Sequence, residues 1–230
     1  MKGDLILPSG VSVLDRLLNG GLPTGSFIHV YGEAASGKTT FALQFVSAAC
    51  RIGVDTIYVN SETGSPVERL EQITGKKFSE IEDRLRILSP KDFIEQGALI
   101  DDIDLYAREG TRLVVVDTLT RLYRSVLDDR KTNYSNHREL NRQAGMLKGL
   151  AVHRDLAVLV LNQVRGSMIE MGGFEPVAKN IMDYWSDYVV RARLGKTTGY
   201  RIFDRTRPEG DPTFSILYLT EKGLATEQKQ

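Results

Sequence analysis

The stretch Gly32-Glu33-Ala34-Ala35-Ser36-Gly37-Lys38-Thr39-Thr40 decides the fold class, because it fits the pattern G-x-x-x-x-G-K-[ST] of a phosphate-binding loop. The two glycines let the backbone curl so that successive N–H groups converge on phosphate oxygens. Lys38 brings a positive charge to the β- and γ-phosphates, and the Thr39 hydroxyl can ligate Mg²⁺. We therefore expect all nine residues to bind a nucleoside triphosphate, with Lys38 also acting in catalysis.

The segments on either side of this loop supply the context that the pattern needs. Residues 26–31 are mostly apolar and are typical of a buried strand that leads into the loop. Residues 38–51 follow as a helix, whose N-terminal dipole favours a bound anion. With strand, loop and helix in this order, a chance match to the pattern is not a serious competitor.

Strand and helix patterns alternate along most of the chain, which predicts an α/β fold with a mostly parallel twisted sheet flanked by helices. Short apolar runs predict buried strands at 27–31, 56–60, 85–88, 113–116 and 157–161. Helical patterns cover 38–51, 66–74, 93–108 and 136–154. Beyond Trp185, short strands at 188–194, 200–205 and 214–220 predict an antiparallel C-terminal extension.

The length of 230 residues fits one large domain over residues 1–226. Its expected parts are a lead-in at 1–25, a nucleotide-binding core at 26–164, a mobile DNA loop at 165–185 and a β extension at 186–220, before a disordered tail at 227–230.

Composition narrows the class of protein further. The 30 basic and 30 acidic residues give no net charge, so any affinity for DNA must come from local patches. The single cysteine, Cys50, excludes a disulfide framework and is expected to be a buried structural thiol. We find no apolar run of membrane-spanning length and no signal peptide, and these features fit a cytoplasmic protein.

Three polar residues near strand ends are candidates for nucleotide chemistry. Asp117 follows four apolar residues and is expected to hold Mg²⁺, although an isolated Asp there can equally cap a helix. Glu62 is the best candidate for the base that orients water, or else it complements the dipole of the next helix. Gln163 can touch the γ-phosphate or make a plain hydrogen bond. Glu33 lies inside the loop, where its side chain is expected to face solvent.

Four segments together resemble the RecA/RadA recombinase superfamily, and the likeness runs over nearly the whole chain. They are the phosphate loop, residues 58–62, residues 113–117 and residues 161–164. The branch that the chain is most similar to contains the archaeal paralogues of RadA that consist of the ATPase core alone. The run Asn162-Gln163-Val164 is the most discriminating segment, because KaiC-like and replicative-helicase relatives usually differ there.

This resemblance implies a RecA-like P-loop ATPase core that binds ATP and Mg²⁺. It implies that Glu62 activates water, that Gln163 senses the γ-phosphate and that Arg69 packs near the adenine. Residues 207–210 fall where recombinases cap the ATP of a neighbouring subunit. Two departures argue against efficient hydrolysis: Asn60 replaces a common Asp, and the capping segment is shortened.

The resemblance also implies two DNA-binding loops, at about 121–138 and 165–179. Their basic residues suit phosphate neutralisation, and interleaved aromatic residues suit base stacking. The alternative is a pair of solvated charged loops. Because the core begins close to the first residue, we expect neither an N-terminal duplex-binding domain nor a subunit-linking anchor. The candidate DNA contacts are Arg121, Arg124, Arg130, Lys131, Arg165 and Lys179.

These observations predict an accessory protein of homologous recombination and DNA repair. It is expected to bind ATP and DNA, to hydrolyse ATP weakly, to lack strand exchange, and to modulate the main recombinase or branched-DNA cleavage. Its expected partners are single-stranded or branched DNA, a RadA-type recombinase and a Holliday-junction resolvase. Three alternatives stay open: an active strand-exchange recombinase, a KaiC-like ATPase without a DNA role, and a nucleoside monophosphate kinase.

Overall fold

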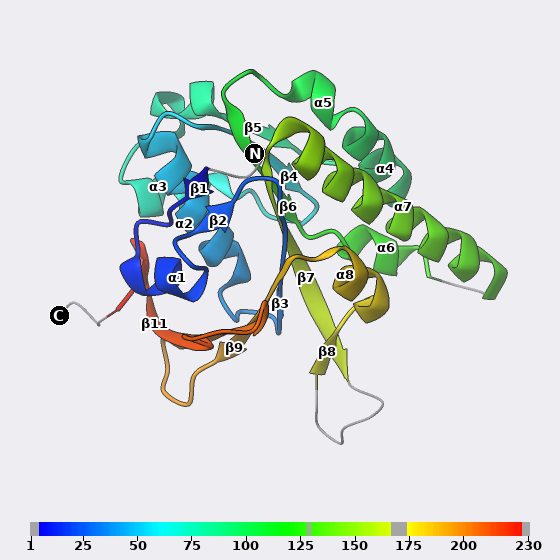
Figure 1. Ribbon diagram of the computed structural model, residues 1–230. Helices are drawn as coiled ribbons and strands as arrows, with labels where there is room; N and C mark the ends of the chain where they lie inside the picture. Colours follow the sequence, from blue (N-terminus) through cyan, green and yellow to red (C-terminus); the bar gives the residue numbers. More distant parts are fainter. Residues whose placement is uncertain (1–4, 128–129, 167–173, 227–230) are drawn as a thin grey trace.

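The computed structural model describes residues 5–127, 130–166 and 174–226, and of residues 130 and 131 it describes only the backbone. The proposed tail at 227–230 lies outside this part. A twisted sheet runs through the centre of the molecule, with helices on both sides (Figure 1).

Strands and helices alternate through the central part of the described chain, as the sequence pattern predicts. The strands are β1 (Ile6–Leu7), β2 (Leu22–Pro23), β3 (Phe27–Gly32), β4 (Asp55–Asn60), β5 (Leu85–Leu88), β6 (Thr111–Asp117), β7 (Ala157–Gly166), β8 (Phe174–Pro176), β9 (Tyr188–Leu194), β10 (Tyr200–Arg207), β11 (Phe214–Thr220) and β12 (Gly223–Ala225). The α-helices are α1 (Ser12–Leu17), α2 (Lys38–Arg51), α3 (Val67–Thr74), α4 (Phe93–Asp101), α5 (Ile103–Tyr106), α6 (Arg121–Ser125), α7 (Arg130–Arg154) and α8 (Lys179–Trp185). Two short 3₁₀ turns, Phe78–Glu80 and Glu82–Arg84, precede β5.

The main sheet has the strand order β12-β11-β10-β9-β3-β7-β6-β4-β5. Strands β5, β4, β6, β7, β3 and β9 run parallel to their neighbours, and β10, β11 and β12 continue the sheet with antiparallel pairing. The α/β fold and the antiparallel extension are therefore confirmed, except that β9 itself is parallel to β3. Since β3 lies between β7 and β9, the loop that follows it opens at the middle of the sheet.

Successive residues of the central strands point to opposite faces of the sheet and so contribute to two separate cores. Helices α1, α2 and α3 cover one core, which takes Ile28 and Val30 from β3. Helices α4 to α8 cover the other, which takes Val158 and Val160 from β7. The two layers of helices thus hold the strand ends, where ligands bind in such sheets, in fixed positions.

Three expectations about local structure were wrong. The helix predicted at 93–108 is two helices, because the chain bends at Asp102 between α4 and α5. The loop predicted at 121–138 is mostly α6 and the first turns of α7. Those first turns are charged, and the buried apolar stripe of α7 begins only after them, with Leu140, Ala144, Leu147 and Ala151. In the second loop, β7 runs on to residue 166, β8 pairs with it, and α8 begins at residue 179.

Cys50 is half-buried at the edge of one core rather than fully buried, and this partial burial raises the pKa of its thiol. Within the described ranges, we find no helix that is long and apolar enough to cross a membrane.

Candidate nucleotide site

The phosphate loop is shaped by two glycines that no other residue could replace without strain. Gly37 stands immediately before α2 with φ of 92°, a backbone conformation that residues with side chains disfavour. A Cβ atom on Gly32 would stand 2.1 Å from the carbonyl oxygen of Ala192 in β9. The loop therefore passes directly against the neighbouring strand, and its N–H groups are free to converge on an anion.

Lys38 projects into the curl of this loop. Its Nζ donates hydrogen bonds to the carbonyl oxygens of Gly32 at 2.9 Å and Glu33 at 2.7 Å. Burial lowers the pKa of Lys38, while the carboxylates of Asp117 and Glu62 oppose that shift. These contacts hold a cationic group at the position that the phosphates of a nucleotide would share.

A buried hydroxyl in the loop is free to hydrogen-bond to a phosphate. The Ser36 hydroxyl is fully buried and has no hydrogen-bond partner among the described residues. It lies beside Gly32, where an added Cβ would be only 2.7 Å from its oxygen. A buried hydroxyl without a partner costs free energy unless a ligand or water pairs with it.

Asp117 stands at the end of β6 and faces the start of α2. Its Oδ2 accepts hydrogen bonds from the Thr39 hydroxyl at 2.9 Å and the Tyr58 hydroxyl at 2.7 Å. Burial raises the pKa of Asp117 despite these two hydrogen bonds, which act in the opposite direction. A carboxylate and a hydroxyl in contact form the oxygen pair that Mg²⁺ uses beside nucleotide phosphates.

Glu62 is reached from three sides at the end of β4. Its Oε1 accepts hydrogen bonds at 3.2 Å from the Thr118 hydroxyl and from Gln163 Nε2. Its Oε2 lies 3.8 Å from Nε of Arg121. Asn60 shapes the turn before it, because its Nδ2 donates to the Gly64 carbonyl at 2.8 Å and its Oδ1 accepts from the Glu62 N–H at 3.3 Å. An Asp at position 60 could not make the first of these bonds.

Gln163 connects two parts of the molecule through its two amide atoms. Its Nε2 bonds to Glu62, and its Oε1 accepts a hydrogen bond from Arg124 at 2.7 Å. Arg124 belongs to α6 and is exposed, whereas Glu62 faces the phosphate loop across the sheet edge. One amide therefore joins the carboxylate near the nucleotide to a cation on the outer surface.

Arg69 contacts the end of β11, and its hydrogen bonds do not involve the phosphate loop. Its guanidinium donates to the carbonyl oxygens of Thr220 at 2.7 Å and Glu221 at 2.8 Å, and so ties α3 to the end of β11. The expected contact with adenine stays a prediction. In the capping segment, Arg207 donates to the Ser186 carbonyl at 3.1 Å.

Arg201 is a residue near the loop that sequence reasoning missed. Its Nε donates to the Ala35 carbonyl at 2.9 Å, and a Cβ on Gly37 would lie 3.4 Å from its Cγ. Since Arg201 lies in β10, more than 160 positions along the chain from Ala35, no local pattern signals the contact. Only the strand order brings the two together.

The predicted DNA contacts divide into three groups. Arg124, Arg165 and Lys179 line one cavity of about 860 Å³. Arg121 turns instead toward Glu62. The side chains of Arg130 and Lys131 lie outside the described part of the structure. Arg165 pairs with Glu175 at 2.8 Å, so this cavity carries both signs of charge.

Comparison with known proteins places this arrangement in a family. A family model described as the KaiC ATPase matches residues 7–132. The DNA repair and recombination protein RadB of Methanoculleus marisnigri is 35% identical over 98% of this chain and 100% of its own. RadB of Methanococcoides burtonii is 34% identical over 89% of this chain and 91% of its own, and RadB of Pyrococcus furiosus is 32% identical over 95% of each chain.

A solved structure agrees with these sequence matches. The crystal structure of the RadB recombinase superposes with a TM-score of 0.81 and 31% identity, covering 97% of this chain and 100% of that one. Since identity above 30% extends over almost the full length, fold and sequence point to the same relatives. This chain belongs to the RadB family of DNA repair and recombination proteins, within the RecA/KaiC-like ATPases.

Proposed function

We propose that this protein is an ATP-responsive, DNA-binding accessory protein of homologous recombination and repair, with weak ATPase activity and no strand exchange. The observation that carries the proposal is the Gln163 amide, which bonds to Glu62 on one side and to Arg124 on the other. If the γ-phosphate of ATP accepts the hydrogen bond from Gln163 Nε2 in place of Glu62, the Gln163 amide would move. The hydrogen bond that its oxygen accepts from Arg124 would then change as well. ATP binding would in this way alter the cationic surface that meets DNA.

The nucleotide end of this proposal assigns one role to each residue. Lys38 neutralises the β- and γ-phosphates, and the N–H groups of residues 33–39 surround them. Thr39 and Asp117 hold Mg²⁺, which supplies charge neutralisation on the phosphates when bound. Glu62 orients the attacking water and accepts its proton.

Slow hydrolysis follows from the contacts of Glu62. Its Oε1 accepts hydrogen bonds from Thr118 and Gln163, and its Oε2 lies 3.8 Å from Nε of Arg121. A base must be within hydrogen-bond reach of the proton it abstracts, so the attacking water has to compete with these partners for the carboxylate. Retention of ATP, rather than its turnover, then becomes the functional state.

The DNA end rests on the cavity beside α6. Arg124 contacts Gln163, and Arg165 and Lys179 stand on other sides of the same hollow. Because the net charge of the chain is zero, this local group of cations carries the interaction with phosphates. We propose single-stranded or branched DNA as the ligand, and a RadA-type recombinase and a Holliday-junction resolvase as protein partners.

The test measures ATP hydrolysis and DNA binding in the same preparations. Wild-type protein, Lys38→Ala and Glu62→Gln are compared with and without single-stranded DNA. We expect slow turnover for the wild type, loss of ATP binding for Lys38→Ala, and ATP binding without turnover for Glu62→Gln. We also expect ATP to change the DNA affinity of the wild type, and expect Gln163→Ala to remove this coupling while ATP still binds.

Two outcomes favour other functions. Strong stimulation of hydrolysis by single-stranded DNA, with filaments in the electron microscope, would indicate an active recombinase. Absence of any salt-dependent DNA binding would favour a KaiC-like ATPase without a DNA role, an alternative that the family match over residues 7–132 keeps open.

A further inference from the structure

Two further hollows lie next to the cavity that holds Arg124, along α7 and α8. His137 and Asn180 line both this cavity and a second hollow of about 470 Å³. Arg138 and Asn141 line both the second hollow and a third of about 470 Å³. These shared residues place the three hollows next to one another, and we call them together the α7–α8 groove.

Positive charge predominates along this groove. The charged residues that line it are the cations Arg124, Arg138, Arg142, Arg165 and Lys179 and the anions Glu139 and Glu175. The anions are already paired within the groove: Arg142 grips Glu139 with two hydrogen bonds of 2.8 and 2.7 Å, and Arg165 lies 2.8 Å from Glu175. Asp101 also pairs with Arg142, and Asp183 pairs with Lys179, so the cations left for an external anion are Arg124 and Arg138.

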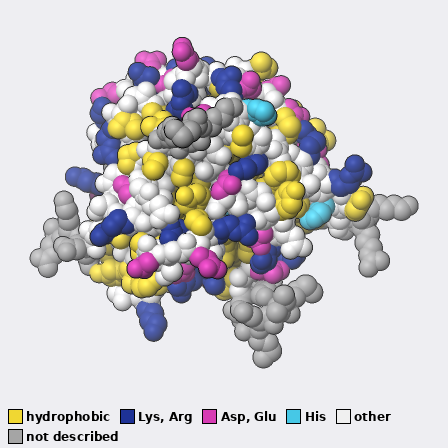
Figure 2. All heavy atoms as spheres, viewed as in Figure 1, with side chains coloured by type: hydrophobic (Ala, Val, Ile, Leu, Met, Phe, Trp, Pro, Cys, Tyr) yellow, Lys and Arg dark blue, Asp and Glu magenta, His cyan; other side chains and the backbone are white. Residues whose placement is uncertain are grey.

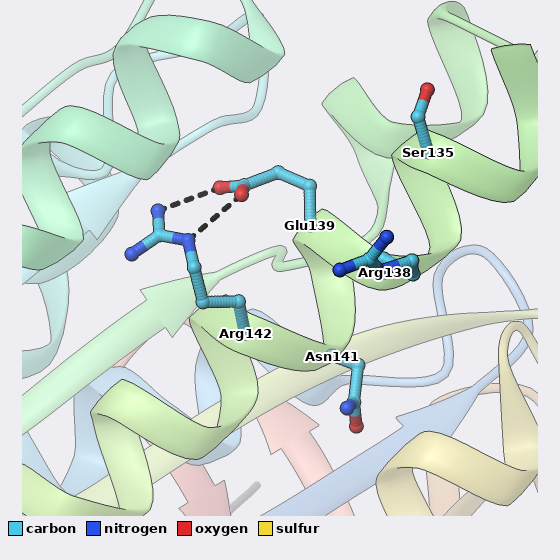
Figure 3. Close-up of a pocket in the computed structure, with 5 residues that line it drawn as sticks. All are labelled: Ser135, Arg138, Glu139, Asn141 and Arg142. Atoms are coloured by element: carbon cyan, nitrogen blue, oxygen red, sulfur yellow. Dashed lines mark hydrogen bonds and ion pairs between the residues drawn. The ribbon is translucent and has the colours of Figure 1, made fainter.

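Arg138 is the most available of these cations. The close-up in Figure 3 shows Glu139 and Arg142 joined to each other, whereas no dashed line reaches Arg138. Among the residues that the structure describes, Arg138 has no ion-pair or hydrogen-bond partner, while Lys179 pairs with Asp183. An exposed guanidinium without a partner suits a phosphate group.

Two aromatic rings stand in the same groove, at the end of α8. The Tyr184 side chain is 77% exposed, which is unusual for so large a ring, and it meets Trp185 edge to face at 4.7 Å between centroids. Trp185 Nε1 donates to Asn141 Oδ1 at 2.9 Å, which fixes the indole against α7. Figure 2 shows hydrophobic, basic and histidine side chains next to one another on the right of the molecule, where α7 and α8 lie.

We propose that single-stranded DNA leaves the Arg124 cavity and follows the α7–α8 groove, with a phosphate on Arg138 and a base stacked on Tyr184. This inference rests on the proposed function, because it extends the same DNA site. The bases must be unpaired and unstacked, because in a duplex the adjacent base pairs cover both faces of each base and leave none for the Tyr184 ring. Duplex DNA would reach Arg138 but would leave Tyr184 unused.

The single tryptophan of the chain makes the groove directly observable. A fluorophore-labelled oligo-dT strand is titrated into the protein, and its anisotropy and the emission of Trp185 are recorded together. For the wild type we expect both signals to change with the same Kd. Arg138→Ala should bind more weakly, and the negative slope of log K against log salt should become less steep by about 0.7. Tyr184→Ala should bind about five-fold more weakly or worse, and Tyr184→Phe should bind like the wild type.

Controls separate this inference from the proposed function. Arg16→Ala removes an exposed arginine of α1 whose side chain makes no hydrogen bond or ion pair among the described residues, and it should bind DNA like the wild type. If Arg124→Ala weakens binding while Arg138→Ala and Tyr184→Ala do not, and Trp185 emission stays constant, DNA is confined to the first cavity and the groove proposal fails. If the wild type binds no oligonucleotide at all, the groove proposal and the proposed DNA role fail together.

Discussion

His29 lies in the middle of β3, with no exposed surface and no hydrogen-bond partner for either ring nitrogen among the described residues. It stacks on Tyr31 at 5.3 Å between ring centroids. Burial lowers the pKa of His29 to about 3, although the Asp183 carboxylate acts in the opposite direction. The imidazole is therefore neutral in the folded protein at every pH at which the protein would normally be studied.

This buried histidine makes stability depend on pH. Below about pH 6.5 the unfolded chain binds a proton at His29 and the folded protein does not. The free energy of unfolding therefore decreases as the pH falls from 6.5 toward 3. We expect His29→Phe, which keeps an aromatic ring, to reduce the loss of unfolding free energy between pH 7 and pH 5 by about 2 kcal/mol. Urea unfolding at the two pH values measures this. An identical pH dependence in the two proteins would contradict the assignment.

Tyr58 stabilises the buried carboxylate of Asp117 with the hydrogen bond from its hydroxyl. Tyr58→Phe removes that bond, so we expect the unfolding free energy to fall by roughly 1.5–3 kcal/mol. Without this donor the pKa of Asp117 rises further, so its proton competes with Mg²⁺ at a higher pH. The measurement is a titration of Mg²⁺ in the presence of ATP at several pH values. As the pH is lowered, Mg²⁺ binding should weaken at a higher pH in the variant than in the wild type.

Tyr31→Phe is the matched control for that experiment. Tyr31 also stands near the end of a central strand, but the structure gives its hydroxyl no hydrogen bond among the described residues. It should therefore leave both stability and the pH profile of Mg²⁺ binding nearly unchanged. Equal effects of the two substitutions would remove the special role of Tyr58.

At the scale of elements, two glycines within α7 face different surroundings. A Cβ at Gly149 meets nothing within 4 Å, whereas one at Gly145 would lie 3.0 Å from Cζ2 of Trp185. Since glycine in a helix interior is about 0.5–1 kcal/mol less stable than alanine, we expect Gly149→Ala to stabilise the protein by about that amount. Gly145→Ala should gain less or lose stability, and should alter Trp185 emission. Thermal unfolding with fluorescence detection reads both, and equal gains at the two positions would contradict the described packing.

The elements show where sequence patterns predict structure and where they do not. Helix α2 begins and ends at the predicted residues because local features fix it: a left-handed Gly37 before it and a continuous buried face within it. Residues 121–138 were predicted as a loop from the family resemblance, and their charged turns carry no apolar stripe. The part of α7 that was predicted as a helix, 136–154, is the part with the buried stripe that begins near Leu140. Local sequence could not reveal that this stripe extends a helix backwards.

The same distinction applies to the residues of the candidate site. Lys38, Thr39, Asp117 and Glu62 were predictable because each follows a strand with a recognisable pattern. The contact of Arg201 with Ala35 was not predictable, because it depends on β9 and β10 returning to the side of β3. Local sequence patterns reveal the residues that follow a strand. The residues that lie beside them in space depend on the strand order of the whole sheet.

At the scale of the whole molecule, the phosphate loop joins the parallel and antiparallel parts of the sheet. Gly32 packs against Ala192 in β9, and Arg201 in β10 holds the loop at Ala35. We therefore expect ATP with Mg²⁺ to slow hydrogen–deuterium exchange in β9 and β10 as well as in α2. Global stability should rise by about 2.7 kcal/mol at a nucleotide concentration 100 times the Kd.

Two variants test how that stabilisation spreads. Lys38→Ala should lose the nucleotide effect everywhere, since it removes the main cation of the loop. Arg201→Ala should keep slower exchange in α2 but lose most of it in β10. If β10 responds equally in wild type and Arg201→Ala, the link through Arg201 is not what carries the effect.

The place of β3 between β7 and β9 also has a consequence for the order of events during synthesis. The loop at residue 32 leaves the ribosome before the strand beside it, because β9 begins only at Tyr188, and Gln44 meets Leu224 later still. At about 5–20 residues per second, the strand that walls the loop follows it by roughly 8–30 s. The growing chain thus carries a complete phosphate-loop sequence long before it has a place for a nucleotide. We expect ATP to bind only after β9 has been synthesised, and a chain terminated before β9 would carry the motif without the site.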